Sequence, residues 1–208
     1  MSYIENGNSN VNFMCSDDKA NIFLIGDSIR LGYCETVKKS LSDKAEVFYI
    51  DENCRNSQYV ITSLNGWQGK FDHPEKIDIV QFNCGHWDVA HWSGAQESVT
   101  GKEEYAKNIR LIIFLLKKYF VNAKLIFATT TPMNPDSSLG INPRTTKEID
   151  EYNCIAIETV KSEGVLINDL NAFVRDWDSG KYDDYCHFTK EAFQCLGEYV
   201  AKLLESYL

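Results

Sequence analysis

The stretch Ile22-Phe23-Leu24-Ile25-Gly26-Asp27-Ser28 combines a short apolar run with an abrupt polar end. An apolar run of this length is typical of a strand buried on both faces, as in a parallel sheet. Gly-Asp-Ser then leads into a helix-compatible segment, which places a serine hydroxyl just past the carboxyl end of the strand. Ligands bind at this edge of open parallel sheets. The stretch therefore predicts an α/β fold with a site at Ser28.

Further apolar runs and helical patterns alternate along the chain. The strand-like runs after the first cover 47–50, 77–82, 124–128 and 165–167. Apolar residues recur at helical spacing over 105–120, 149–160 and 193–204, and Thr145-Thr146-Lys147-Glu148 fits a capping box before the second of these. Strands that alternate with helices indicate βαβ units and a parallel sheet covered on both faces.

Length and charge favour one soluble domain. The chain has 208 residues and a formal net charge of −9. This length supports a sizeable single core, and the acidic balance leaves no basic footprint for nucleic acid or an anionic membrane. No apolar run approaches membrane-spanning length. We expect a polar N-terminal extension over 1–19 and a single domain over 20–208.

The N-terminus and the cysteines indicate a cytoplasmic protein. Residues 1–19 lack the basic and apolar regions of a signal peptide. The seven cysteines form no Cys-x-x-Cys pair, which is typical of reduced thiols rather than of a disulfide framework. The histidines, which are His73, His86, His91 and His187, form no compact ligand motif. We therefore expect no metal and no cofactor.

A second motif near the C-terminus complements the serine. In Asp184-Tyr185-Cys186-His187, a carboxylate and an imidazole are separated by two residues. A serine hydroxyl is a weak nucleophile until an imidazole accepts its proton, and a carboxylate orients that imidazole. Ser28 could instead serve only as a helix cap, and His187 could simply begin a helix. The three groups together favour catalysis.

The order of these blocks resembles the GDSL, or SGNH, hydrolase superfamily. Gly26-Asp27-Ser28 matches its first block, and Asp184-Tyr185-Cys186-His187 matches its last. Glu52-Asn53-Cys54-Arg55-Asn56-Ser57 stands at the place of the second block, and Asn83-Cys84-Gly85-His86-Trp87-Asp88 is similar to the third, usually Gly-x-Asn-Asp. The resemblance spans roughly 20–207. It implies a three-layer α/β/α sandwich with a flavodoxin-like parallel sheet of about five strands.

The resemblance also implies residue roles. Ser28 is the expected nucleophile, His187 the general base and then acid, and Asp184 the group that orients His187. Cys186 lies beside His187, but we expect it to point away, because adjacent residues of an extended segment face opposite sides.

The oxyanion hole departs from the family pattern. Its usual donors are the serine N–H, a glycine N–H of the second block and an asparagine side chain of the third. Here Arg55 or Asn56 replaces the glycine, and Trp87 aligns with the asparagine. An amide offers two N–H donors, whereas indole offers one on a bulky ring. We therefore expect Ser28 with the side chain of Asn83 or Asn56, and regard Arg55 and Trp87 as weaker candidates.

Residues in the same blocks are expected to bind substrate. They are Asp27, Arg55, His86 and Trp87. His86 is also a candidate oxyanion donor. Arg55 could bind a substrate carboxylate or carbonyl, or pair with Asp51 or Glu52 at the surface. The aromatic side chains Trp87 and Trp92 could stack on a sugar or only pack their loop onto the sheet.

These features predict a serine esterase that hydrolyses a small acyl ester, such as an acetyl group on a sugar, through an acyl-serine. The Asn-x-Gly-x-x-Asp form of the third block resembles carbohydrate-esterase-like members, and no large apolar lid segment is present. Two alternatives stay open: an acyltransferase that uses the same serine, and a non-catalytic sugar-binding descendant. A phosphate-binding α/β protein is disfavoured, because no glycine-rich loop follows the first strand.

Overall fold

Five parallel strands form the centre of the molecule. The computed structural model describes residues 13–138 and 140–208. The strands are β1 (Ala20–Ile25), β2 (Ala45–Tyr49), β3 (Ile79–Phe82), β4 (Lys124–Ala128) and β5 (Leu166–Asn168). Their order is β2-β1-β3-β4-β5, and each neighbouring pair is parallel. This is the flavodoxin-like order, which reverses between β1 and β3. The expected sheet is confirmed.

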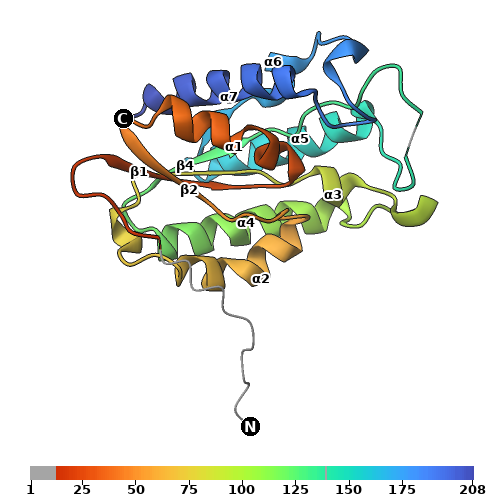
Figure 1. The fold of residues 1–208 in the computed structure, drawn as a ribbon. Helices are drawn as coiled ribbons and strands as arrows, with labels where there is room; N and C mark the ends of the chain where they lie inside the picture. The colour runs from red at the N-terminus through yellow and green to blue at the C-terminus, as the bar shows by residue number, and fades with distance from the viewer. Residues whose placement is uncertain (1–12, 139) are drawn as a thin grey trace.

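Helices cover both faces of this sheet, which confirms the three layers (Figure 1). One face carries α1 (Ser28–Ser40), α6 (Leu170–Val174) and α7 (Lys190–Glu205), and the other carries α2 (Ser57–Gln68), α4 (Lys102–Tyr119) and α5 (Thr146–Ser162). The short helix α3 (His86–Val89) follows β3, and single 3-10 turns cover Pro74–Lys76, Trp92–Gly94 and Ser179–Lys181. Thr145 and Glu148 form the predicted capping box at the start of α5.

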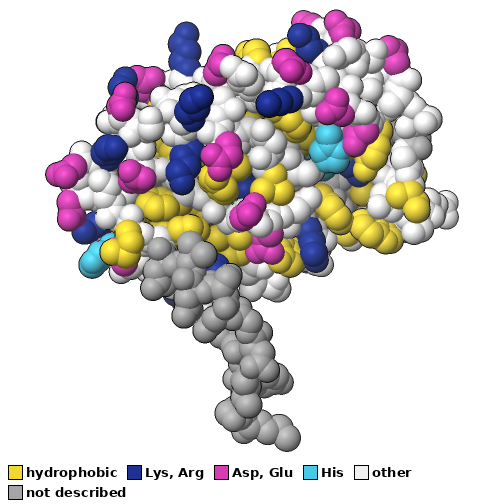
Figure 2. Space-filling view, in the orientation of Figure 1, with side chains coloured by type: hydrophobic (Ala, Val, Ile, Leu, Met, Phe, Trp, Pro, Cys, Tyr) yellow, Lys and Arg dark blue, Asp and Glu magenta, His cyan; other side chains and the backbone are white. Residues whose placement is uncertain are grey.

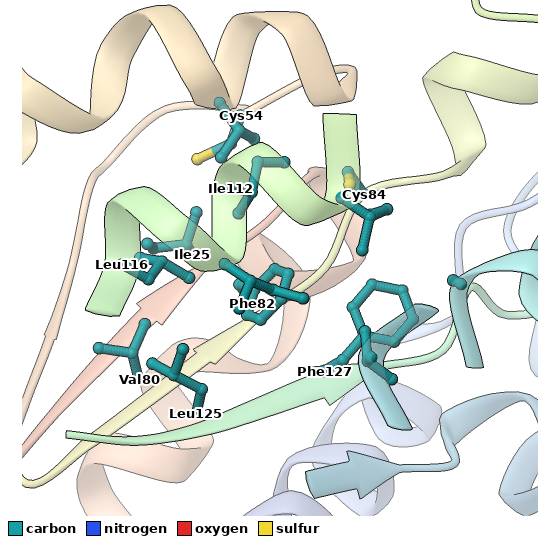
Figure 3. Close-up of a cluster of buried hydrophobic side chains, with 14 of the residues drawn as sticks. Ile25, Cys54, Val80, Phe82, Cys84, Ile112, Leu116, Leu125 and Phe127 are labelled. Atoms are coloured by element: carbon teal, nitrogen blue, oxygen red, sulfur yellow. The ribbon is translucent and has the colours of Figure 1, made fainter. Parts of the chain in front are cut away.

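The alternating side chains of β1 supply two separate cores. Phe23 and Ile25 belong to the core under α2, α4 and α5, whereas Ile22 and Leu24 belong to the core under α1 and α7. Successive strand side chains point to opposite faces, so an unbroken apolar run serves both layers. Figure 3 shows the first core, with Ile25 on the same side as Ile112 of α4.

The last part of the expected N-terminal extension packs against the domain. Phe13 forms a parallel bridge with Phe71, and the two rings lie 4.9 Å apart between centroids. The preceding residues, 1–12, lie outside the described part of the chain. The partly buried Phe13 thus attaches the start of the segment 14–19 to the core of the domain.

The surface and the thiols agree with a reduced, acidic protein. Figure 2 shows Lys and Arg side chains interspersed with Asp and Glu over one face. All seven cysteines fall within the described residues, and each is a free thiol. Within those residues, no helix has both the length and the apolar character needed to cross a bilayer.

Candidate active site

The reversal of strand order between β1 and β3 marks the position of the site. In open α/β sheets, the crevice at this point is where ligands bind. Ser28 follows β1 as the first residue of α1, and Asn83 directly follows β3. The segment before α7 brings Asp184 and His187 to the same edge, where they meet Ser28.

Ser28, His187 and Asp184 form a hydrogen-bonded chain. His187 Nε2 lies 2.8 Å from Ser28 Oγ, and His187 Nδ1 lies 2.7 Å from Asp184 Oδ2. When Nδ1–H donates to the carboxylate, Nε2 is left free to accept the serine proton. The structure thus brings the three predicted residues together in the order of nucleophile, base and orienting carboxylate.

A tight turn holds Asp184 in place. Its Oδ1 accepts hydrogen bonds from the backbone N–H groups of Cys186, at 2.8 Å, and His187, at 2.7 Å. Partial burial raises the pKa of Asp184, but the hydrogen bonds from these two residues outweigh burial and lower the pKa below its ordinary value. Asp184 is therefore ionised at neutral pH and can stabilise an imidazolium.

A cavity of about 110 Å³ lies over these residues. It is lined by Ser28, Asn53, Trp87, Ala90, Trp92, Asn142, Arg144, Tyr185 and His187. A larger groove of about 370 Å³ adjoins it and is lined by Arg55, Asn56, Tyr59, Trp87, Trp92 and Val99. Trp87 and Trp92, whose ring centroids are 5.4 Å apart, line both spaces. A substrate with its ester over Ser28 can therefore extend along the groove.

The two amides expected to complete the oxyanion hole do not line this cavity. Asn83 is buried against the chain turn before Ser28, where a Cβ added to Gly26 would lie 1.9 Å from Asn83 Oδ1. Asn56 caps α2, and its Oδ1 accepts from the N–H of Tyr59 at 3.0 Å. Both side chains thus have contacts that serve the fold, and the assignment of Asn83 or Asn56 as side-chain donor stays a prediction.

Two amides do line the cavity: Asn142 and, on the turn beside Ser28, Asn53. The Oδ1 of Asn53 accepts from the backbone N–H of Arg55 at 2.9 Å, so the turn orients the amide and leaves Nδ2 without an acceptor among the described residues. Arg55 has a φ of 51°, a conformation that favours glycine, and it occupies the place of the family's glycine. The neighbouring N–H of Cys54 donates to the carbonyl of Gly26 at 3.1 Å, which fixes this turn beside Ser28.

The backbone N–H of Ser28 is a second donor at the cavity. Ser28 is the first residue of α1, so its N–H has no partner within the helix. No acceptor for this N–H is found among residues 13–138 and 140–208. The positive end of the helix dipole also favours negative charge at this position.

Comparison with known proteins identifies the architecture. No family model and no curated protein matches the sequence. Among solved structures, a lipase/acylhydrolase from Enterococcus faecalis aligns with a TM-score of 0.69 and 18% identity over 90% of this chain and 96% of that one. The acetyl xylan esterase AlAXEase aligns with a TM-score of 0.70 and 16% identity, over 88% and 99%. A GDSL-like lipase from Bacteroides thetaiotaomicron gives 0.68 and 13%, over 90% and 89%.

The chain has the GDSL/SGNH hydrolase fold. At these identities the likeness establishes the fold and not the activity. The resemblance seen in the sequence blocks is thereby confirmed at the level of architecture, with the first and last blocks meeting at one edge of the sheet.

Within this GDSL/SGNH fold, Asp27 lies in the interior next to Ser28 and stabilises the start of α1. Asp27 is completely buried and caps α1, with Oδ1 accepting from the N–H of Ile29 at 3.0 Å. Burial raises its pKa, although the amide of Asn83 and the N–H of Ile29 lower it in part. Since no part of the side chain reaches the surface, the prediction that Asp27 contacts substrate is wrong.

His86 is also buried, behind the wall of the cavity. Its Nδ1 accepts from Arg144 Nε at 3.2 Å, and its Nε2 lies 3.1 Å from Thr131 Oγ1. Burial, together with the charges of Arg144 and His187, lowers the pKa of His86 well below its ordinary value, so the imidazole is neutral. His86 supports Arg144 and does not line the cavity, so the predicted substrate contact and oxyanion bond are wrong.

Buried polar contacts join the loops of the site. Arg30 is fully buried, and its Nη2 donates to the carbonyls of Gly26, at 3.1 Å, and Glu52, at 2.6 Å. Asp88, the last residue of the third block, accepts from the N–H of Ser57 at 3.1 Å. These bonds link the loops after β1, β2 and β3, and so they hold Asn53 beside Ser28.

Three residues that line the cavity are not among the predicted site residues. They are Asn142, Arg144 and Tyr185. The segment before α5 has no recognisable motif, and its one signal was that it follows β4 and so lies at the same edge of the sheet. Arg55, which was predicted, is exposed and lines the groove. Its guanidinium carbon lies 4.8 Å from the ring centroid of Tyr59, and it forms no ion pair with Asp51 or Glu52.

Cys186 lies closer to the triad than expected. Its Sγ is 3.7 Å from His187 Nδ1, so it does not point away from the imidazole. Asp184, Cys186 and His187 have potential metal ligands within 4.8 Å of one another. Burial raises the pKa of the Cys186 thiol to about 12, and a thiol that stays protonated is a poor metal ligand. That the protein needs no metal stays a prediction.

Proposed function

We propose that the protein is a serine hydrolase that cleaves a small acyl ester through an acyl-enzyme at Ser28. The observation that carries this proposal is the chain of contacts from Asp184 to His187 to Ser28, at 2.7 and 2.8 Å. Capping does not explain Ser28, because Asp27 is the residue that caps α1. An imidazole aligned with the hydroxyl and oriented by an ionised carboxylate is instead what a serine nucleophile needs.

The reaction follows from these positions. His187 Nε2 accepts the Ser28 proton while Oγ attacks the ester carbonyl carbon, and the Ser28 N–H and Asn53 Nδ2 stabilise the negative oxygen that forms. The imidazolium then donates its proton to the departing alkoxide oxygen, which leaves an acyl-serine. His187 next deprotonates a water that attacks this acyl group, and the proton returns to Ser28 as the acid departs.

The dimensions of the site favour a short acyl group and a cyclic alcohol. The cavity over Ser28, at about 110 Å³, accommodates a small acyl group more readily than a long chain. The adjoining groove presents the indole rings of Trp87 and Trp92, and flat aromatic surfaces of this kind pack against sugar rings. We therefore infer an acylated sugar as the substrate class.

The test is an ester series with matched serine variants. The series contains p-nitrophenyl acetate, butyrate and octanoate, and an acetylated xylose, each assayed with and without an added alcohol acceptor. We expect acetate ester turnover to exceed octanoate turnover, release of free acetate, and a covalent acetyl group on Ser28 in rapidly quenched samples. Ser28→Ala should remove activity, while Ser42→Ala, which lies just beyond the C-terminal end of α1, should retain it.

Other outcomes select the alternatives. Transfer of the acetyl group to the alcohol, with little free acetate, would identify an acyltransferase. Sugar binding without turnover of any ester would identify a binding protein. Ester turnover that survives in Ser28→Ala would reject Ser28 as the nucleophile.

A further inference from the structure

Arg144 places a buried positive charge in the wall of the catalytic cavity. Its side chain lies in the same cavity lining as Ser28 and His187, and the residue is only 7% exposed. Within the described residues, no Asp or Glu forms an ion pair with Arg144. A charge removed from water is costly unless it is paired, so an unpaired guanidinium beside a cavity requires an explanation.

The partners of Arg144 orient the guanidinium without balancing its charge. Nε donates to His86 Nδ1 at 3.2 Å, Nη1 to the carbonyl of Asn142 at 3.3 Å, and Nη2 to Cys186 Sγ at 3.4 Å. One face lies against the ring of Tyr185, with 5.3 Å between the guanidinium carbon and the ring centroid. The imidazole, carbonyl, thiol and phenol ring are all neutral, and a guanidinium retains further N–H donors after these bonds.

Asp27, which the charge of Arg144 influences, does not balance that charge through an ion pair. Asp27 is completely buried, and the charge of Arg144 is only one of several influences that lower its pKa, against a larger rise from burial. Asp27 Oδ2 has no hydrogen-bond partner among the described residues, so Asp27 makes no bidentate contact with Arg144.

A second arginine extends the positive potential along the groove. Arg55 lines the groove next to the cavity, with its guanidinium over Tyr59, and it forms no ion pair with a described carboxylate. The protein as a whole has a formal net charge of −9. Two unpaired arginines at connected spaces of an acidic protein are suited to attract an anion that the remaining surface would repel.

We propose that Arg144 binds a carboxylate of the substrate, so that the preferred ester carries a negative charge close to the bond that is cleaved. This inference rests on the proposed ester hydrolysis and specifies its substrate class. A planar guanidinium pairs with a carboxylate through two parallel hydrogen bonds, which adds both strength and orientation. The carboxylate can belong to the acyl group, as in a half-ester of a dicarboxylic acid, or to the sugar, as in an acetylated uronic acid.

Two matched pairs of esters test the proposal and separate these two sources. One pair is p-nitrophenyl acetate and p-nitrophenyl hemisuccinate, and the other is acetylated methyl glucoside and acetylated methyl glucuronide. We expect the wild type to prefer the charged member of one pair. Arg144→Met should lower kcat/KM for that member at least about tenfold more than for its neutral counterpart, mainly through KM. Arg144→Lys should lose less, since it keeps the charge.

The control variant is Arg110→Met, which removes one positive charge from the exposed side of α4. It should leave the preference for the charged ester as in the wild type. Equal losses for both members of each pair in Arg144→Met would overturn the proposal, because Arg144 would then act on the oxyanion or on the fold. A wild type that turns over both pairs without preferring either charged ester would overturn it as well.

A binding measurement separates failure of this proposal from failure of the proposed function. Calorimetric titration of Ser28→Ala with methyl glucuronide, succinate and neutral methyl glucoside needs neither turnover nor a folded Arg144 variant. Tighter binding of a carboxylate ligand by Ser28→Ala, together with no turnover of any ester by the wild type, would keep carboxylate binding by Arg144 and reject the hydrolase. Normal turnover of neutral esters, with no tighter binding of either carboxylate, would reject this proposal and keep the hydrolase.

Discussion

The two sides of Ser28 differ in how closely they follow the family pattern. On the side of the base, His187 and Asp184 stand in the usual block and meet Ser28 at the distances that proton transfer needs. On the side of the oxyanion and substrate, Trp87 aligns with the asparagine of the family pattern, and Arg55 or Asn56 aligns with its glycine.

The difference reflects what each side must supply. Proton transfer requires one basic group of suitable pKa, aligned with the hydroxyl and held in one tautomer. An oxyanion requires only N–H donors directed at one point, and different residues can supply them. Under the proposed mechanism, substitution is easier to accommodate on the second side, where Asn53 lines the cavity and can supply a donor.

Removal of the base side should have the largest effect. Ser28→Ala and His187→Ala should each lower kcat by about 10⁴-fold or more, because the nucleophile and base act as one unit. The double variant should be little slower than either single variant. Additive losses, measured as initial rates on p-nitrophenyl acetate, would show that the two residues act independently.

Asn53 tests the oxyanion side. Asn53→Ala should lower kcat by about 100-fold with little change in KM, since loss of one oxyanion donor has an effect of this size. Asn56→Ala, which removes the α2 cap but no donor in the cavity, is the matched control and should lose stability more than rate. A large loss of kcat in Asn56→Ala and none in Asn53→Ala would favour the sequence-based assignment instead.

The pH dependence of the rate sharpens the view of the base side. An imidazolium cannot accept the serine proton, so kcat/KM should fall about tenfold per pH unit along the acid limb of the profile. Asp184, whose pKa is lowered, stays ionised at neutral pH and does not itself produce this limb there. A log-rate profile without an acid limb would argue against His187 as the base.

Trp92 tests whether the groove binds the alcohol. Trp92 is 48% exposed and lines both cavity and groove. Trp92→Ala should raise KM for the acetylated sugar about two- to tenfold, with a smaller change for p-nitrophenyl acetate, because stacking contributes modestly beyond buried area. Phe114→Ala, which removes an exposed ring from α4, is the control. Unchanged KM in both variants would assign Trp92 to loop packing.

The smallest expected effect concerns stability. Burial is the main cause that lowers the pKa of His86 well below its ordinary value. Below about pH 6.5, therefore, the unfolded chain binds a proton at this histidine and the folded protein does not. The free energy of unfolding consequently decreases as the pH decreases. When the pH is lowered from 7.5 to 5.5, the free energy of unfolding of His86→Gln should fall by about 1.4 kcal/mol less than that of the wild type. Urea unfolding at both pH values measures the difference.

The same experiment has an internal check. Burial raises the pKa of Asp88 to about 6, which makes the folded state bind a proton more readily and opposes the loss of stability on acidification. This contribution is present in both proteins and cancels in the comparison. An equal decrease in the free energy of unfolding in the wild type and in His86→Gln would mean that His86 becomes protonated while the protein stays folded.

The alternation of strands and helices could be predicted because it depends on the local spacing of apolar residues along the sequence. The run 22–25 is apolar at every position, which only a strand covered on both faces explains, and the structure buries all of it. The capping box of Thr145 and Glu148 was likewise readable, because both partners lie within one turn. Ser28, Asp184 and His187 were found because the family blocks carry them together.

Only the tertiary structure decided which polar side chains face the cavity. Asp27 and His86 lie in or beside the motifs, yet both are buried, whereas Asn53 and Arg144 line the cavity. A motif records the order of residues along one segment, but exposure depends on which other segments pack over it. The loops after β2, β3 and β4 approach Ser28 from distant parts of the chain, and their mutual packing sets the oxyanion and substrate side.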